Sequence, residues 1–206
     1  MRGRTYPAID FLSSATVVVD VGANVGAAAI WFAEVYPRAE IYGFEPHRQS
    51  YDYACSNTKS FGRIHISNFG LSDHDHEAEL FIGKHTNTTN SVHRARLNSS
   101  VSERIDLRDA ASAIAALGVH HIDILKIDTE GCEVPILSSI LGTYAPKAIY
   151  MEYHNEADRL RLDQMLSGDY ILYASRASRP HVGETIHIRL DAFPDPSVID
   201  AIAVRS

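Results

Sequence analysis

The sequence has little of what marks exported, membrane-bound or nucleic-acid-binding proteins. Its 206 residues include only two cysteines, Cys55 and Cys132, which argues against a disulfide framework and favours a reducing compartment, the cytoplasm. There is no run of about eighteen apolar residues, and residues 1–7 lack the apolar core of a signal peptide, so we expect neither a membrane span nor export. The net charge of −7, from 26 acidic and 19 basic residues without a Lys/Arg cluster, disfavours a nucleic-acid partner.

The remaining composition is that of one globular domain. No low-complexity tract interrupts the chain, and 206 residues, 45% of them hydrophobic, can bury one substantial core but are few for two. We therefore expect a single domain over residues 1–206.

Strand and helix patterns alternate along the chain. The run at 17–21 is continuous and rich in valine and ends at Gly22, which is typical of a strand buried on both faces of a parallel sheet. Strands are expected at 17–21, 40–44, 63–69, 122–127, 148–153, 170–174 and 199–204, with further pairing segments at 79–82 and 186–190. Helices are expected at 25–36, 51–58, 106–117, 134–141 and 155–166, with Asn24 capping the first and Asn155 with Asp158 the last. This order predicts an α/β fold: a doubly wound, mostly parallel seven-stranded sheet with helices on both faces.

A long segment interrupts this alternation. Residues 83–100 are rich in Asn, Thr, Ser and His and have few apolar side chains, which predicts a mobile loop. We interpret it as a lid over an acceptor site, with Asn90, Ser91 and His93 as contacts, and a plain loop is the alternative.

The turn after the first strand is rich in glycine. In a doubly wound sheet, ligands bind beyond the carboxyl ends of the strands. Here Gly22 lets the backbone approach a ligand, Gly26 lets the helix pack closely on the strand, and Asp20 supplies a buried acceptor, with Ala23 and Asn24 between them. Two glycines, where a dinucleotide site has three, favour a cationic nucleoside that bears an amino acid. A tight connection without a ligand would use the same residues.

The next two strand ends complete a candidate nucleoside site. Glu45, before Pro46, follows the second strand and can accept hydrogen bonds from both ribose hydroxyls. Asn68, Phe69 and Gly70 follow the third strand, where they can frame an adenine ring. A surface acid and an ordinary turn are the alternatives.

Charged residues crowd the end of the strand expected at 122–127. Lys126, Asp128, Glu130 and Glu133 lie within eight positions, and such charge beside an apolar strand is costly unless it is paired or used. Acids that favour a helix N-terminus, with Lys126 paired to a neighbour, would be a purely structural explanation.

Together these strings resemble the FkbM family of methyltransferases. Its signatures are similar to 19–26, to 44–46, to 70–73 and above all to the Lys-x-Asp-x-Glu-Gly-x-Glu string at 126–133, and the resemblance runs from about 17 to 154. It implies a Rossmann-like class I methyltransferase fold, S-adenosylmethionine as donor, and transfer of methyl to oxygen, commonly a hydroxyl of a sugar, polyketide or other secondary metabolite.

Methylation of a hydroxyl needs a base near the transferred methyl group. We expect His154 to be this base, because imidazole titrates nearest neutral pH, with Asp128 as the rival and Lys126 and Glu130 beside them. Asp128 also belongs to the expected cofactor site, and we expect His154, Glu133 and the loop residues Ser91 and His93 to contact the small-molecule acceptor. Asp128, Glu130 and Glu133 could alternatively hold Mg²⁺.

Other interpretations stay open. Only sixteen residues precede the first strand, fewer than in many family members, so the acceptor site is either open or completed by a second subunit of a homo-oligomer. A non-catalytic nucleoside-binding module is the leading alternative, and an NAD-dependent oxidoreductase is a second one that the incomplete glycine pattern disfavours.

Overall fold

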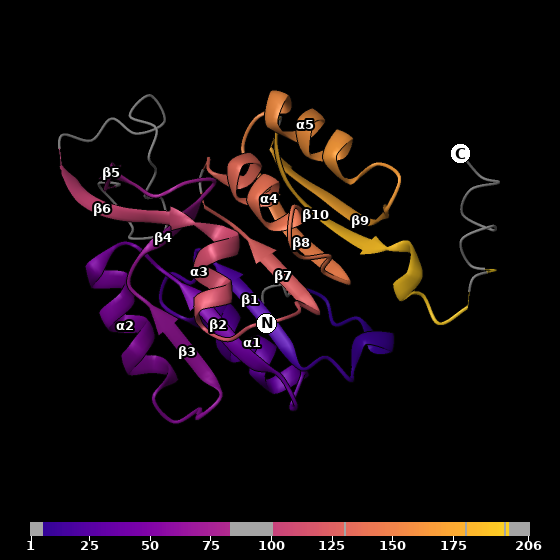
Figure 1. Cartoon of the computed structure of the whole chain (residues 1–206), viewed down its shortest axis with the longest axis horizontal. Coiled ribbons are helices and arrows are strands. Elements are labelled where there is room, and N and C mark those ends of the chain that lie inside the picture. The colour runs from indigo at the N-terminus through magenta and orange to yellow at the C-terminus, as the bar shows by residue number, and fades with distance from the viewer. Residues whose placement is uncertain (1–5, 83–100, 130, 180, 196, 198–206) are drawn as a thin grey trace.

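A seven-stranded sheet forms the centre of the protein (Figure 1). The computed structural model describes residues 6–82, 101–129, 131–179, 181–195 and 197. The strand order is β3-β2-β1-β7-β8-β10-β9, parallel except that β10 runs antiparallel to both neighbours. The strands are β1 (Val17–Val21), β2 (Glu40–Phe44), β3 (Ile64–Ser67), β7 (Ile124–Ile127), β8 (Ala148–Tyr153), β9 (Tyr170–Arg179) and β10 (Val182–Arg189). This confirms the expected doubly wound α/β class.

Helices cover both faces of the sheet. They are α1 (Ala27–Val35), α2 (Arg48–Thr58), α3 (Ala110–Ala116), α4 (Glu133–Leu141) and α5 (Glu156–Leu166), with short 3-10 turns at Asp10–Leu12 and Leu190–Ala192. Val19 and Val21 of β1 face a core shared with α3, α4 and α5, whereas Val18 faces the core shared with α1. The valine run of β1 is therefore buried on both sides, as a central parallel strand requires. None of the described helices is long and apolar enough to cross a membrane.

A second, three-stranded sheet lies beside the main one. It consists of β4 (Gly70–Ser72), β5 (His76–Phe81) and β6 (Ser102–Asp109) in the order β4-β6-β5. The helix expected at 106–117 is wrong at its start, because 106–109 still belong to β6. Ile105 and Leu107 alternate inward to pack on Leu80, and Asp109 then caps α3 by accepting from the backbone N–H of Ser112.

The helix caps and the last strands differ in part from expectation. Asn155 caps α5 as predicted, accepting from the backbone N–H of Asp158 at 2.8 Å. Asn24 does not cap α1, which begins after Gly26. β9 extends to Arg179, and β10 completes the seven strands, while the strand expected at 199–204 and the loop 83–100 lie outside the described residues.

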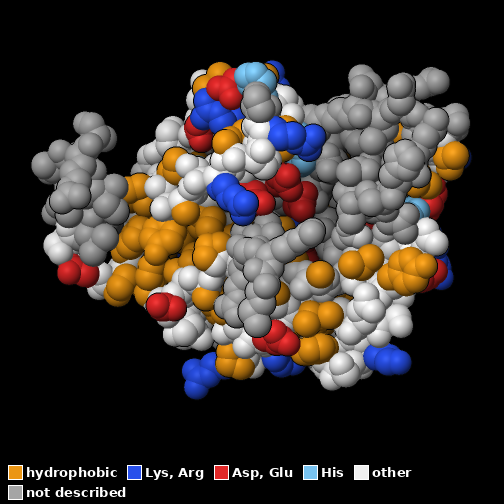
Figure 2. Space-filling view, turned by 180° about the vertical axis from the view of Figure 1, so that it is seen from behind, with side chains coloured by type: hydrophobic (Ala, Val, Ile, Leu, Met, Phe, Trp, Pro, Cys, Tyr) orange, Lys and Arg blue, Asp and Glu red, His pale blue; other side chains and the backbone are white. Residues whose placement is uncertain are grey.

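The far end of the sheet carries partly exposed aromatic residues. Seen from behind, apolar side chains gather on the surface toward the end where β9 lies (Figure 2). Tyr173 of β9 is 48% exposed, and its ring lies 6.3 Å from that of Phe11, which also packs on Phe193.

Candidate functional site

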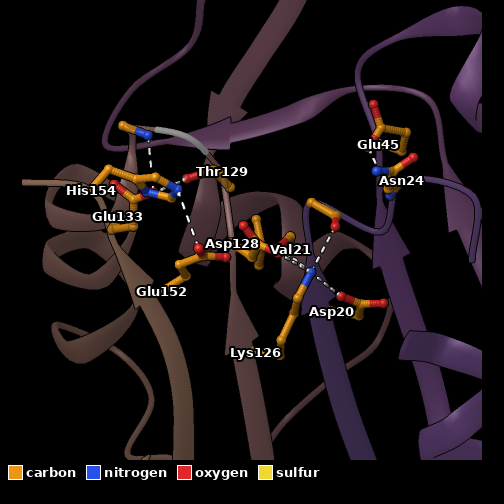
Figure 3. A network of polar contacts seen from close by, with 12 residues as sticks. Asp20, Val21, Asn24, Glu45, Lys126, Asp128, Thr129, Glu133, Glu152 and His154 are labelled. Atoms are coloured by element: carbon orange, nitrogen blue, oxygen red, sulfur yellow. Dashed lines mark hydrogen bonds and ion pairs between the residues drawn. The ribbon is translucent and has the colours of Figure 1, made fainter. Parts of the chain in front are cut away.

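The carboxyl ends of β1, β2, β7 and β8 meet at one edge of the sheet and bring most of the expected site residues together (Figure 3). The glycine turn and Glu45 lie on one side of this edge. Asp128, Glu133 and His154 lie on the other, with Lys126 between the two groups.

The glycine turn is held between the ends of two neighbouring strands. Gly22 and Ala23 both donate their backbone N–H to the carbonyl of Phe44, each at 3.0 Å. Gly22 has a φ of +78°, and a Cβ atom on it would lie 1.9 Å from the carbonyl oxygen of Asp128, so only glycine fits. The close approach that Gly22 allows is therefore to the end of β7.

Gly26 has a different neighbour from the one expected. Its φ is +83°, and an added Cβ would lie 3.0 Å from the side chain of Thr58 and 3.4 Å from Ala54, both in α2. Gly26 therefore lets the chain pass close to helix α2. The sequence predicted close packing of helix α1 on a strand instead.

Lys126 binds the turn from beneath. Its side chain is 3% exposed, and its Nζ lies 2.9 Å from Oδ1 of Asp20, 2.7 Å from the carbonyl oxygen of Gly22 and 3.2 Å from that of Val21. Burial opposes the charge, but the carboxylates of Asp20 and Asp128 outweigh it and raise the pKa of Lys126. The ammonium group thus fixes the turn, and the catalytic role that the sequence suggests for Lys126 stays a prediction.

Glu45 joins the turn to the end of β2. It is buried, and its carboxylate accepts hydrogen bonds from the backbone N–H of Asn24 at 2.8 Å and of His47 at 2.9 Å. Burial raises the pKa of Glu45 to about 7, against the effect of these two bonds. Asn24 takes a left-handed φ of 49° here, which explains why it does not cap the helix.

The segment after β3 packs beside Glu45 and Pro46. Asn68 donates from Nδ2 to the carbonyl oxygens of Glu45 at 3.0 Å and of Pro46 at 3.1 Å. Gly70 is packed tightly, since a Cβ there would lie 2.4 Å from Leu107 and 3.3 Å from Pro46.

An aromatic platform lies next to this segment. The ring of Phe69 packs 5.4 Å from that of Phe44, and the guanidinium of Arg108 lies 4.0 Å above it. No local motif in the sequence points to Arg108, which comes from β6 of the second sheet.

The other side of the edge holds a mixed cluster, which we define as Asp128, Glu152 and His154. One ligand atom from each of the three lies within 4.8 Å of the others, so the cluster could hold a metal ion. Glu152 was not predicted, although its place two residues before His154 puts both at the end of β8, where chain alternation turns them to the same side.

Glu133 lies behind this cluster. Its carboxylate is 1% exposed and accepts from Nδ1 of His154 at 3.2 Å and from the backbone N–H of Gly131 at 2.9 Å. Burial opposes ionisation, but these bonds outweigh it and hold the pKa of Glu133 below its usual value. Of the expected trio of cation ligands, Glu133 supports His154 from behind, while Glu130, like Ser91 and His93, lies outside the described residues.

Comparison with known proteins gives relatives by sequence. A Pseudomonas aeruginosa protein described as AMB antimetabolite synthetase AmbE is 26% identical over a region covering 69% of this chain and 8% of AmbE. The Sordaria araneosa protein described as methyltransferase sdnD is 23% identical, covering 63% of this chain and 62% of sdnD. The chain thus spans less than two thirds of either relative.

Solved structures resemble the fold. Aeropyrum pernix fibrillarin, solved with bound S-adenosyl-L-methionine, superposes with a TM-score of 0.56 at 11% identity, covering 89% of this chain and 70% of fibrillarin. A precorrin-6y C5,15-methyltransferase from Geobacter metallireducens gives 0.52 at 11% identity, covering 85% and 81%. At such identities the likeness shows the fold, that of Rossmann-like methyltransferases.

The family itself follows from a model match. The description of that model is methyltransferase FkbM domain, and it matches residues 20–173, which include the turn, Glu45, the cluster and Glu133. Because this match covers most of the chain, the protein belongs to the FkbM family of methyltransferases.

Proposed function

We propose that the protein transfers a methyl group from S-adenosylmethionine to a hydroxyl of a small molecule. The observation that supports S-adenosylmethionine as the methyl donor is a set of buried hydrogen-bond acceptors around the glycine turn. Within the described part of the chain, Oδ2 of Asp20 and Oδ1 of Asn24 are buried without a hydrogen-bond partner. Such atoms are costly to bury unless a ligand satisfies them.

These acceptors fit the donor groups of S-adenosylmethionine. Its ribose hydroxyls and ammonium group all donate hydrogen bonds, and the Glu45 carboxylate has lone pairs left beyond the two it uses. When bound, the cofactor supplies an activated methyl group on a positively charged sulfur. Both carboxylates near the turn, those of Asp20 and Asp128, would favour such a positive charge if it is bound beside them.

In this proposal the acceptor meets the methyl group at the cluster, which lies across the edge from the glycine turn. Asp128 contributes to both sides of the site. Its carbonyl oxygen lies against the glycine turn, and its side chain belongs to the cluster. In the metal-free protein we propose His154 as the base, because Nδ1 donates to Glu133 and Nε2 is the nitrogen that lies toward Glu152, at 3.8 Å. Asp128 is the alternative. The net charge of −7 supports a small molecule over a phosphate backbone.

The donor is tested by calorimetric titration with S-adenosylhomocysteine, the product form of the cofactor. We expect binding by the wild type that is lost in the Asp20→Ala, Glu45→Ala double variant, with NAD as a ligand that does not bind. Absence of S-adenosylhomocysteine binding by folded wild type would sink the proposal, and binding of NAD alone would replace it with an oxidoreductase. Binding without turnover on any hydroxyl acceptor would favour the non-catalytic module.

The proposed contact between Glu45 and the ribose makes binding depend on pH. Ionised Glu45 accepts charge-assisted hydrogen bonds from hydroxyls, and protonation below its pKa of about 7 removes the charge and turns one of its oxygens into a donor. Affinity for S-adenosylhomocysteine should therefore fall about tenfold from about pH 8 to about pH 6. Calorimetry across this range measures it, and Glu45→Gln should bind more weakly but with the dependence removed. A flat wild-type profile contradicts the assignment.

A further inference from the structure

The cluster of Asp128, Glu152 and His154 combines two carboxylates and an imidazole from adjacent strand ends. Asp128 follows β7, and the other two end β8, so a paired backbone places all three at one edge. Their ligand atoms lie within 4.8 Å of one another, a span that one ion can bridge with small side-chain movements. The side chains of Asp128 and Glu152 are 30% and 28% exposed, which leaves the cluster open on one side.

Glu133 supplies the support that a metal-binding histidine needs. A histidine ligand almost always donates its other ring N–H to a carboxylate, which fixes the tautomer and the ring orientation. Here Oε1 of Glu133 accepts from Nδ1 of His154, and Nε2 lies toward Glu152 (Figure 3). Glu133 is the first residue of helix α4 and its carboxylate is buried, with Oε2 lacking a hydrogen-bond partner among the described residues.

The charge around the cluster also calls for a cation. Lys126 lies 3.9 Å from Asp128 but only 2.9 Å from Asp20, which already neutralises it. Glu184 of β10 pairs in register with Glu152 and adds a further carboxylate near Asp128. Asp128, Glu152 and Glu184 thus bring three carboxylates to this side of the edge.

We infer that Asp128, Glu152 and Nε2 of His154 bind one divalent cation of the class that accepts both nitrogen and oxygen ligands, such as Mn²⁺ or Zn²⁺. An imidazole ligand favours these ions over Mg²⁺, which prefers oxygen alone. The inference rests on the proposed function, in which the ion would hold an oxygen of the acceptor beside the methyl group. In the ion-loaded protein His154 would be a ligand and not the base, the charge of the ion would make the bound hydroxyl more acidic, and the hydroxyl proton would pass to water on the exposed side of the cluster.

The test is a titration of the chelator-treated full chain with MnCl2, ZnCl2 or MgCl2, followed by calorimetry and, for Mn²⁺, by electron paramagnetic resonance. We expect one Mn²⁺ or Zn²⁺ per chain, with weaker Mg²⁺ binding. Asp128→Asn and Glu152→Gln should each abolish binding, and Glu133→Gln should weaken it by roughly 10–100-fold. Glu77→Gln, which removes the same charge from an exposed pair on β5, is the matched control and should bind as the wild type does.

Circular dichroism and S-adenosylhomocysteine titration of the same metal-free samples separate the two proposals. Glu152→Gln is the main variant, because a change at Asp128 would also alter the charge next to Lys126. If S-adenosylhomocysteine binds and neither Mn²⁺ nor Zn²⁺ does, or if binding survives in Glu152→Gln, the ion site is overturned and the methyltransferase proposal stands. Ion binding without S-adenosylhomocysteine binding leaves the site and overturns the proposed function.

Discussion

Gly22→Ala is expected to abolish binding of S-adenosylhomocysteine and to lower the free energy of unfolding by roughly 2–4 kcal/mol. The added methyl carbon would lie 1.9 Å from the carbonyl oxygen of Asp128, and the φ of +78° is strained for alanine in any case. Because the clash is with backbone, either the turn or the end of β7 must move. Urea unfolding and calorimetric titration measure the two effects.

Gly118→Ala is the matched control for this variant. Gly118 has nearly the same φ, +77°, but nothing lies within 4 Å of an added Cβ. It should cost only about 1 kcal/mol, the conformational strain alone, and leave binding unchanged. Equal losses of stability in the two variants would mean that the contact with Asp128 does not matter.

Lys126→Met is expected to lower the free energy of unfolding by about 3–5 kcal/mol, the largest effect of any single change proposed for this protein. Asp20 is fully buried, and within the described residues neither of its oxygens has a hydrogen bond, so the ion pair with Lys126 is what compensates its charge. The carbonyls of Val21 and Gly22 would lose their donor as well. Thermal and urea unfolding give the loss.

Lys147→Met removes a comparable contact at the opposite end of the sheet. Lys147 pairs with Asp123 at 2.7 Å, but its side chain is 44% exposed, and Asp123 keeps hydrogen bonds from the backbone of Thr16 and Val17. We expect a loss of about 1 kcal/mol or less. The double variant Asp20→Asn, Lys126→Met should regain part of the lost stability, since no buried carboxylate is left unpaired, and failure to regain any would contradict this account.

Patterns within one element predicted the fold well. The valine run of β1, the acids after β2 and β7 and the Asn155 cap all depend on neighbours close in the chain, and the structure has each of these elements. The helix expected from residue 106 started too early because Asp106 and Arg108 look helical in sequence, while the partners that make them a strand, β4 and β5, lie elsewhere in the chain.

The site was predictable in its residues but less so in their roles. Lys126 and Glu133 belong to one charged motif. The motif alone does not predict that Lys126 binds the carbonyl of Gly22 or that Glu133 binds the ring of His154. Glu152 could not be predicted from its neighbours in the sequence. It belongs to the cluster because β8 pairs with β7, which brings it close to Asp128. Asn24 was taken as a cap since its type suits one, but its backbone N–H is bound by Glu45.

In the proposed reaction, Asp128 belongs to both the donor side and the acceptor side of the site. Its carbonyl limits the size of residue 22 on the donor side, and its side chain belongs to the cluster on the acceptor side. A shift of β7 that reshaped the acceptor pocket would therefore also disturb the turn. Substitutions in this strand are thus a poor way to change which acceptor the protein methylates. Divergence in substrate preference among relatives that keep this contact should accumulate instead on β10, whose Glu184 pairs in register with Glu152.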